Sequence, residues 1–352
     1  MSVTSPHPVT ISLVVPVFNE EASIPLFIDA FLNARSAWPF HSEVTFVNDG
    51  SSDSSLALMR YFAAQHEFVH YVSLSRNFGK EVALSAGMDH ARGDAVILMD
   101  VDLQHPFNAI ESFVDVWQNE GVEMVFGVRN QDNEETPLKQ WTSRQFYRFF
   151  NMMAHTPLPE GGGDFRLLDR RVVEALRSLP ERNRFMKGLY AWVGFTTRAV
   201  PYQQPARVAG TTTFNYWKLW NFALDGIVSF STWPLRVWSY IGVGVALLAF
   251  LYGLYVVLST LLWGSDVPGY ASLAAGVMFL GGMQLMSIGV LGEYLGRLFI
   301  ESKARPLYIV AESSPANRST PVSTDDNRRA QPASPAGKQP VVNNSEKQHA
   351  TE

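Results

Sequence analysis

The sequence contains no cysteine among its 352 residues. A disulfide framework and thiol chemistry are therefore excluded, and the composition fits a reducing compartment. Basic residues are also fewer than acidic residues, 28 Lys and Arg against 33 Asp and Glu, so the formal net charge is −5. We do not expect a chain of this charge to bind nucleic acid, although a local basic patch is still compatible with it.

The amino-terminal end lacks the pattern of a secretory signal. The first ten residues contain no Lys or Arg, and the apolar run over residues 11–17 is too short for a signal-peptide core. Long apolar runs are also missing before residue 235. We therefore expect the amino-terminal part of the chain to remain in the cytoplasm.

Short apolar strands alternate with helices from residue 10 to residue 129. The pattern predicts strands at 11–17, 44–47, 71–74, 95–99 and 121–129, and helices at 22–37, 54–65 and 81–91. This alternation is typical of a doubly wound α/β domain with a parallel sheet. Open sheets of this class bind ligands at the carboxyl ends of their strands.

The predicted strand at 95–99 ends in two aspartates, Asp100 and Asp102. Residues i and i+2 of an extended chain point the same way, so both carboxylates are expected to approach one point. Carboxylates that face one point repel each other unless a cation lies between them, and Mg²⁺ or Mn²⁺ bound together with substrate phosphates fits this role. For an isolated Asp-x-Asp, two solvated acids at a strand end are the simpler explanation.

The other strand ends favour a binding site. Polar residues or glycine follow the predicted strands at 18–21, 48–53 and 75–80, and four such ends at one sheet edge predict a site. Taken alone, Asp49 and the two residues after it are typical of a turn with a helix cap.

Asp164 follows three glycines, and we predict either an active-site acid on a loop or a turn residue. Asp169 is expected to cap a helix that runs to Leu176.

Two long apolar spans follow, at about 235–263 and 271–291. Each exceeds the roughly 20 residues that cross a bilayer, and the first lacks charge over most of its length, which disfavours a pair of core helices. The loop at 264–269 has no Lys or Arg, whereas basic residues flank the pair. The positive-inside rule therefore predicts that both ends of the pair lie in the cytoplasm.

The segments around these spans have distinct compositions. Aromatic residues over 211–234 predict a helix in the headgroup layer, with a core helix as the alternative. An aromatic stretch over 130–160 predicts a helix packed over the site. Residues 301–352 form an extension, which is expected to be disordered from about residue 313.

Two features of the second span predict local contacts. Glu293 lies four residues before Arg297, which predicts an ion pair along the helix. Gly289, Gly292 and Gly296 have small-residue spacing suited to close helix packing, within or between chains, and a homo-oligomer is expected.

Four motifs together resemble a known family: 14–21 (VVPVFNEE), 48–51 (NDGS), 75–80 (SRNFGK) and 100–104 (DVDLQ). The chain resembles the inverting family 2 glycosyltransferases of GT-A fold that act on polyprenyl phosphates, which are related to the dolichol-phosphate mannose synthases. Later motifs at 163–166, 180–188 and 217–220 are most similar to bactoprenol glucosyltransferases. The resemblance covers about residues 8–310.

The resemblance implies an α/β fold with a Rossmann-like, mostly parallel GT-A domain, followed by the interfacial helix and two transmembrane helices. The expected boundaries are 1–210, 211–234, 235–300 and 301–352. The residues expected to bind the nucleotide-sugar are Pro16, Phe18, Asn19, Glu20, Asp49, Gly50, Ser51, Arg76, Asn77 and Lys80.

The resemblance also implies roles in chemistry. Asp100, Asp102 and Gln104 are expected to bind Mg²⁺ or Mn²⁺ on the diphosphate. Asp102 and Asp164 are the expected catalytic residues. A lipid phosphate is already ionised near neutral pH, so we expect Asp164 to orient the acceptor or the sugar rather than to act as a base.

The acceptor phosphate is expected to contact Arg166, Arg207 and Lys218. One departure weakens this assignment. Relatives often carry lysine in a Gly-x-Thr-Lys-Phe stretch, whereas this chain has Thr213 at that position.

The implied reaction is transfer of a hexose, expected to be glucose from UDP-glucose, to undecaprenyl phosphate at the inner face of the bacterial cytoplasmic membrane. The product would supply modification of O-antigen or another surface glycan. Alternatives are transfer of mannose, an N-acetylhexosamine or aminoarabinose, and a non-catalytic scaffold or flippase subunit. A processive polysaccharide synthase is disfavoured because no Gln-x-x-Arg-Trp motif is found, and a sugar nucleotidyltransferase because the expected glycine-rich loop is missing.

Overall fold

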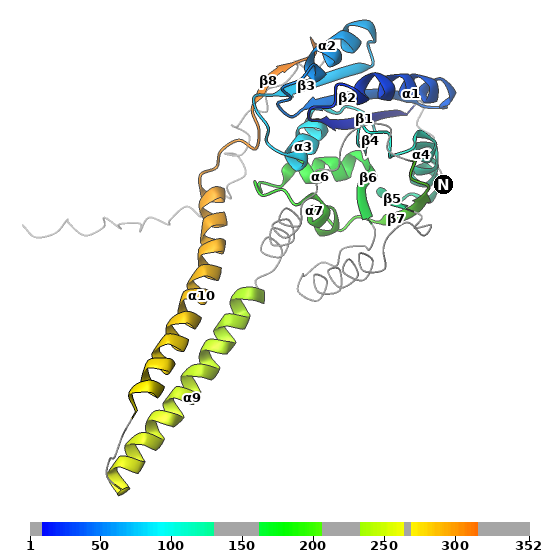
Figure 1. Ribbon diagram of the computed structural model, residues 1–352. Helices are drawn as coiled ribbons and strands as arrows, with labels where there is room; N and C mark the ends of the chain where they lie inside the picture. Colours follow the sequence, from blue (N-terminus) through cyan, green and yellow to red (C-terminus); the bar gives the residue numbers. More distant parts are fainter. Residues whose placement is uncertain (1–8, 130–161, 206–232, 264–268, 316–352) are drawn as a thin grey trace, which may run out of the picture. The chain divides into compact units, whose positions relative to one another are not determined.

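The computed structural model describes residues 9–129, 162–205, 233–263 and 269–315 (Figure 1). The helix predicted over 130–160, residues 211–232 of the aromatic segment and the tail beyond residue 315 therefore lie outside the described residues.

Within these residues, eight strands form one sheet in the order β7-β5-β6-β4-β1-β2-β3-β8. The strands are β1 (Thr10–Val17), β2 (His41–Asn48), β3 (Val69–Leu74), β4 (Ala95–Leu98), β5 (Met124–Arg129), β6 (Gly162–Asp169), β7 (Thr197–Tyr202) and β8 (Val310–Ser313). The first four strands are parallel, so Val17 lies beside Asn48 and Val14 beside Leu98. The predicted sheet edge is confirmed.

The sheet is mixed rather than wholly parallel. β6 lies between β4 and β5 and is antiparallel to both, and β8 is antiparallel to β3. The mostly parallel α/β fold is confirmed, but the pattern of the first 129 residues carries no information on strands that arrive from later in the chain.

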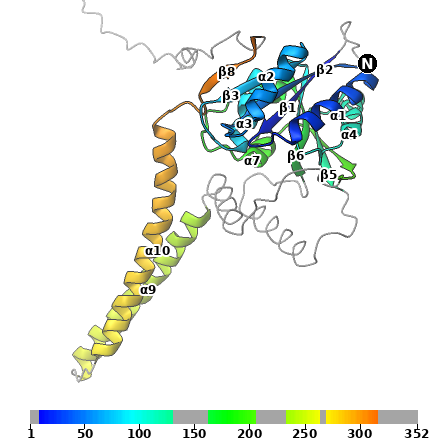
Figure 2. The ribbon, with the colours of Figure 1, turned by 45° about the horizontal axis from the view of Figure 1, so that its top comes forward.

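Helices cover both faces of the sheet (Figures 1 and 2). They are α1 (Ser23–Ala37), α2 (Ser55–Gln65), α3 (Lys80–His90), α4 (Phe107–Glu120), α6 (Arg170–Ser178) and α7 (Met186–Trp192). Leu13 of β1 belongs to the core with Phe27 of α1, whereas Val14 belongs to the core with Leu84 of α3. Strands buried on both faces explain the unbroken apolar runs of the sequence.

Most of the predicted elements are confirmed within one or two residues. Asp169 caps α6 as predicted, because its carboxylate accepts the N–H of Arg171. The elements near the site that were not predicted are α4, α7, β7, and β6 as a strand. Asp164 therefore lies on β6 and not on a loop, which corrects the expectation.

Two long helices follow, α9 (Trp233–Trp263) and α10 (Tyr270–Ser302). In the described chain, Val237–Tyr255 and Gly276–Ser302 are long and apolar enough to cross a membrane, by length and composition. α10 continues well past the predicted end at residue 291. Glu293 and Arg297 form the predicted pair at 3.0 Å.

The glycines of α10 have no close neighbour in the described part of the chain. A Cβ built on Gly289, Gly292 or Gly296 would meet no heavy atom within 4 Å. These residues therefore do not serve helix packing within the described chain, and packing between chains stays a prediction.

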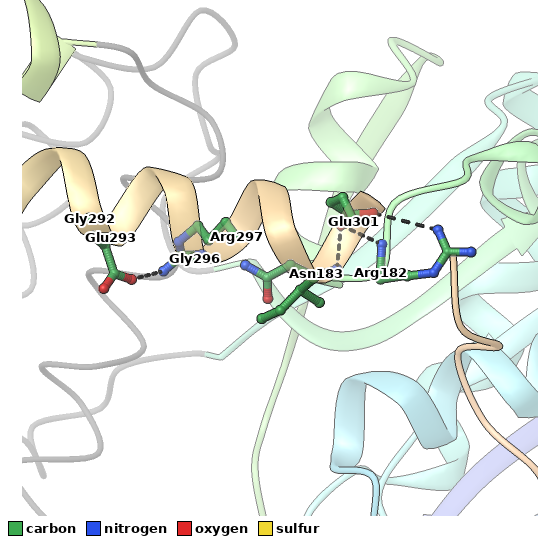
Figure 3. Close-up of a pocket in the computed structure, with 8 residues that line it drawn as sticks. Arg182, Asn183, Gly292, Glu293, Gly296, Arg297 and Glu301 are labelled. Carbon is green, nitrogen blue, oxygen red and sulfur yellow. Dashed lines mark hydrogen bonds and ion pairs between the residues drawn. The ribbon is translucent and has the colours of Figure 1, made fainter. Parts of the chain in front are cut away.

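The carboxyl end of α10 is tied to the loop between α6 and α7 (Figure 3). Glu301 accepts the backbone N–H groups of Arg182 at 2.8 Å and of Asn183 at 3.1 Å. A pocket of about 360 Å³ lies beside this contact, and Glu293 and Arg297 are among the residues that line it. The contact links residues that are more than a hundred positions apart in sequence.

The chain after α10 adds an edge strand to the sheet. The N–H of Ser75 donates to the carbonyl of Ile309 at 2.9 Å, and the N–H of Ser314 donates to the carbonyl of Tyr71 at 3.0 Å. The hydroxyl of Tyr308 donates to Asp89 at 2.8 Å. The extension predicted from residue 301 therefore completes the sheet, which the sequence pattern did not indicate.

We expect truncation after residue 305 to destabilise the protein, because it removes β8 and exposes the edge of β3. Loss of about three backbone hydrogen bonds at roughly 1 kcal/mol each corresponds to a fall of about 5–10 °C in apparent Tm. Thermal unfolding of the full chain in detergent measures the change. Truncation after residue 315 keeps β8 and is the matched control; equal melting of both truncations would contradict a stabilising role for this strand.

Candidate active site

The loops after β1 and β2 are joined by hydrogen bonds. The backbone N–H of Asn19 donates to the Ser51 hydroxyl at 3.0 Å, and the Asn19 side-chain oxygen accepts the N–H of Ser52 at 2.8 Å. Glu20 is held in the same way by Ser55, at 2.9 Å. Phe18 lies beside this junction with 48% of its surface exposed. The two loops thus form one rigid edge with an exposed aromatic ring.

Gly50 allows the loop after β3 to approach this edge. Its φ of +69° lies in the left-handed region, and a Cβ at this position would lie 2.4 Å from the carbonyl carbon of Arg76. Only glycine meets both requirements without distortion.

The side chain of Asp49 holds the loop after β3 in place. Its carboxylate accepts the N–H groups of Phe78 at 2.7 Å and Gly79 at 2.9 Å. Burial raises the pKa of Asp49, and these two hydrogen bonds oppose the increase. Because this loop leads directly into Lys80, Asp49 helps to place that side chain. A contact of Asp49 with a nucleotide stays a prediction.

Lys80 connects two of the predicted strand ends with β6. Its Nζ atom lies 2.7 Å from Oδ1 of Asp100 and 3.1 Å from Oδ2 of Asp164. Burial favours the neutral amine, but the two carboxylates outweigh it and raise the pKa of Lys80. The lysine is therefore a permanent cation between two anions that would otherwise repel each other.

Asp164 is a stable anion. Burial alone would raise its pKa, but the charges of Lys80 and Lys187 outweigh burial and lower the pKa to about 2. A carboxylate with this pKa is a weak base at neutral pH. The predicted role in orientation agrees with this charge state better than the role of a base.

The carboxylates of Asp100 and Asp102 fit a divalent cation that also binds substrate oxygens. Asp100 is partly exposed at the sheet edge, and Oδ1 of Asp102 accepts the N–H of Gln104 at 3.1 Å. Among the described residues, no group of three or more Asp, Glu, His or Cys side chains could hold a metal without other ligands. One or two carboxylates with substrate phosphates are the usual ligands of Mg²⁺. The predicted metal contact of the Gln104 side chain is not tested.

His105 belongs to the site but was not predicted. Its Nδ1 accepts the backbone N–H of Asp100 at 3.0 Å, and its ring stacks on Phe165 at 4.6 Å between centroids. Burial lowers the pKa of His105, which favours the neutral ring required by this hydrogen bond. Its position directly after the Asp100–Gln104 motif was the signal in the sequence.

Arg166 lies beneath the site. It is only 5% exposed, its guanidinium lies 3.7 Å from the ring centroid of Tyr190, and it donates to the carbonyl of Gly163 at 2.6 Å. Its predicted contact with an acceptor phosphate stays a prediction. Arg207 and Lys218, the other expected acceptor ligands, lie outside the described residues.

The remaining predicted residues lie along the same edge. Arg76 and Asn77 are exposed, and the Arg76 guanidinium lies 4.0 Å from the ring centroid of Phe78. Pro16 lies within β1 and is partly buried. Lys187, at the start of α7, acts on the charge of Asp164 and was given no role in the sequence analysis.

Comparison with known proteins identifies the family. The profile of Glycosyl transferase family 2 matches residues 12–177, and that of the GtrB C-terminal hairpin matches residues 233–298. A bactoprenol glucosyl transferase of Shigella phage SfV is 50% identical over 300 residues, which are 85% of this chain and 97% of that protein. The chain belongs to glycosyl transferase family 2. The resemblance inferred from the motifs is confirmed.

Other matches of this family 2 glycosyltransferase extend over similar lengths. A prophage bactoprenol glucosyl transferase homolog of Escherichia coli K12 is 48% identical over 85% of this chain and 98% of its own length. Among solved structures, the mannosyltransferase PcManGT from Pyrobaculum calidifontis, in complex with GDP-Man and Mn²⁺, is 17% identical. It covers 82% of this chain and 88% of its own, with a TM-score of 0.45.

We expect Gly50→Ala to lower the apparent Tm by roughly 5 °C or more, because a strained φ and a backbone clash together cost about 1–3 kcal/mol. Gly121→Ala is the matched control: its φ is +67°, but a Cβ there meets no heavy atom within 4 Å. Thermal unfolding of both variants separates the clash from the strain. An equal loss in the two variants would show that the approach of Arg76 does not require glycine.

Proposed function

We propose that this glycosyltransferase moves glucose from UDP-glucose to undecaprenyl phosphate, the phosphate of bactoprenol. The central observation is the position of Lys80 between Asp100 and Asp164, at the edge formed by the loops after β1 and β2. The match along almost the full length of a bactoprenol glucosyl transferase at 50% identity supports the choice of sugar and lipid.

The joined loops after β1 and β2 would hold the UDP group. Phe18 offers an exposed ring to the uracil base, and Asn19 and Glu20 lie beside it on a backbone that their hydrogen bonds keep in place. Ser51 and Gly50 form the opposite side of this edge. Arg76 and Asn77 belong to the loop before Lys80 and would contact the diphosphate.

The reaction exchanges one bond at the anomeric carbon. An oxygen of the lipid phosphate attacks C1 of glucose from the face opposite UDP, so the C1–O bond to UDP breaks and the configuration inverts. The electron pair of that bond stays on the β-phosphate of UDP. No proton needs to be removed, because the attacking phosphate is already ionised near neutral pH.

Charge stabilisation on the leaving phosphate is the main task of the site. Lys80 places a permanent positive charge beside Asp100, where the diphosphate would lie. Bound Mg²⁺ or Mn²⁺, held by Asp100 and Asp102, would neutralise further charge on the same group. Asp164, held on Lys80, would orient a glucose hydroxyl or the acceptor.

The two apolar helices α9 and α10 would anchor the enzyme in the cytoplasmic membrane. We propose that both ends of this pair face the cytoplasm, where UDP-glucose is available. Arg207 and Lys218 would bind the acceptor phosphate just before α9, with Arg166 shaping the site from beneath. Gly289 and its neighbours in α10 would pack against a second copy of the chain.

The product would be a lipid-linked glucose used to modify O-antigen or another surface glycan. Because this product remains in the membrane, organic extraction separates it from UDP-glucose and free glucose. Another hexose as donor, or a scaffold without activity, would give a different result in the same experiment.

We expect the full chain in detergent, with undecaprenyl phosphate and Mg²⁺ or Mn²⁺, to move label from UDP-glucose into the organic phase. Asp102→Asn should lower the rate by roughly 10²-fold or more, because it removes a negative charge that holds the cation. The cation in turn would bind the diphosphate. Asp115→Asn, on the exposed face of α4, is the control for a neutralised surface aspartate.

If label moves from a GDP-sugar or from another UDP-sugar instead, the sugar of that donor takes the place of glucose in the proposal. No transfer from any donor by folded protein would favour the scaffold.

We expect Asp164→Asn to lower the rate by roughly 10²-fold without removing any acid limb that the wild-type rate shows between pH 5 and 7. With a pKa of about 2, Asp164 is ionised throughout this range and cannot produce an inflection there. Initial rates of lipid glucosylation at saturating donor measure this. An acid limb that is present in the wild type and absent from the variant would identify Asp164 as a base instead.

A further inference from the structure

Asp164 and Arg166 share a group of polar side chains with Glu81 and Tyr190, and the proposed reaction gives the last two no role. They come from three elements, and we refer to them as the Glu81 cluster: Glu81 of α3, Asp164 and Arg166 of β6, and Tyr190 of α7. Each contributes one buried polar atom without a hydrogen-bond partner in the described part of the chain: Oε2, Oδ1, Nε and the phenol oxygen, respectively.

Glu81 connects α3 to the start of α7. The backbone N–H of Met186, the first residue of α7, donates to the Glu81 carboxyl group. The hydroxyl of Ser85, one turn later in α3, contacts both the carbonyl of Glu81 at 3.0 Å and the sulfur of Met186 at 3.8 Å. The contact between the two helices therefore converges on the residue that follows Lys80.

The charged groups around Glu81 come from every element packed against it. Lys80 lies before it on α3, Asp164 and Arg166 face it from β6, and Lys187 and Tyr190 face it from α7. Two carboxyl groups in one buried cluster do not both ionise readily, because like charges repel each other in a medium of low dielectric constant.

The two carboxyl groups differ in their partners. Asp164 has an ion pair with Lys80 at 3.1 Å, which stabilises its charge. Glu81 has no ion pair of this length within the described residues. Burial, and then the charge of Asp164, raise the pKa of Glu81 to about 8, although Lys80 and Lys187 act in the opposite direction. At neutral pH the proton of the pair therefore resides on Glu81.

We propose that Glu81 is a positioning residue that acts in its protonated form: it joins α3 to α7 and leaves Asp164 as the anion that holds Lys80 at the diphosphate. This inference rests on the proposed function of Lys80 and Asp164. Ionisation of Glu81 would add a second negative charge beside Asp164, and this charge would draw Lys80 and Lys187 away from the reacting groups.

The first test is the pH dependence of glucose transfer by the full chain in detergent. We expect the wild-type rate to fall about tenfold between pH 7 and pH 9, because about a tenth of a group with pKa 8 is protonated at pH 9. Glu81→Gln keeps a neutral polar side chain, so its rate should change less than twofold over this range. Glu81→Ala should already be slow at pH 7, and Asp115→Asn on the exposed face of α4 should keep the wild-type profile.

An alkaline fall of the same size in Glu81→Gln and wild type would overturn the proposal. So would a rate of Glu81→Gln at pH 7 as low as that of Glu81→Ala, because the glutamine should replace the protonated acid.

The second test does not depend on turnover. The pKa of Glu81 is higher in the folded protein than the unfolded value near 4.5, so protonated Glu81 contributes stability that is lost as the pH rises. The apparent Tm of the wild type should therefore fall relative to that of Glu81→Gln between about pH 5 and pH 8. Above pH 8 the two curves should run parallel. Curves that are parallel over the whole range would overturn the proposal.

Asp164→Asn gives a second variant in case Glu81→Gln does not fold. It leaves Glu81 in place but removes the neighbouring charge, so the pH-dependent loss of stability should end at a lower pH than in the wild type. An unchanged end point would contradict coupling between the two carboxyl groups. If the wild type transfers no glucose at any pH, the proposed function fails, and the melting curves still decide whether Glu81 is protonated.

Discussion

Lys80 lies between two carboxylates from different strands, and the architecture of the site follows from this arrangement. Asp100 lies two residues after the end of β4, and Asp164 lies on β6, which runs antiparallel beside β4. Without a cation the two side chains would repel each other at the edge where a diphosphate has to bind. The ammonium group of the first residue of α3 removes this repulsion and still presents positive charge to the ligand.

The position of Lys80 depends in turn on backbone groups rather than on its own packing. Asp49 accepts two N–H groups of the loop before Lys80, and Gly50 lets that loop approach to a distance that no side chain would permit. The loop after β1 is joined to the loop after β2 by the hydrogen bond from the backbone N–H of Asn19 to the Ser51 hydroxyl. A polar edge with so many internal hydrogen bonds is preorganised, so little order has to be created when the charged donor binds.

The carboxyl-terminal part of the described chain is held by several contacts. Glu301 binds the loop between α6 and α7, and β8 pairs with β3. The α/β domain is therefore built from segments before and after the two apolar helices. The same loop leads into α7, whose first residue contacts Glu81, so the end of α10 and the Glu81 cluster are joined by a short stretch of chain.

The sequence by itself determined the alternation of strands and helices, the two apolar spans, and Asp100 and Asp102 at one strand end, because these depend on local periodicity and on the motifs of the family. It did not determine that Asp164 lies on a strand, that β8 returns to the sheet, or that His105, Lys187 and Glu81 belong to the site. Those facts depend on contacts between residues far apart in the chain. Only the tertiary structure decided which charges are neighbours, and hence in which direction the pKa of each carboxyl group is shifted.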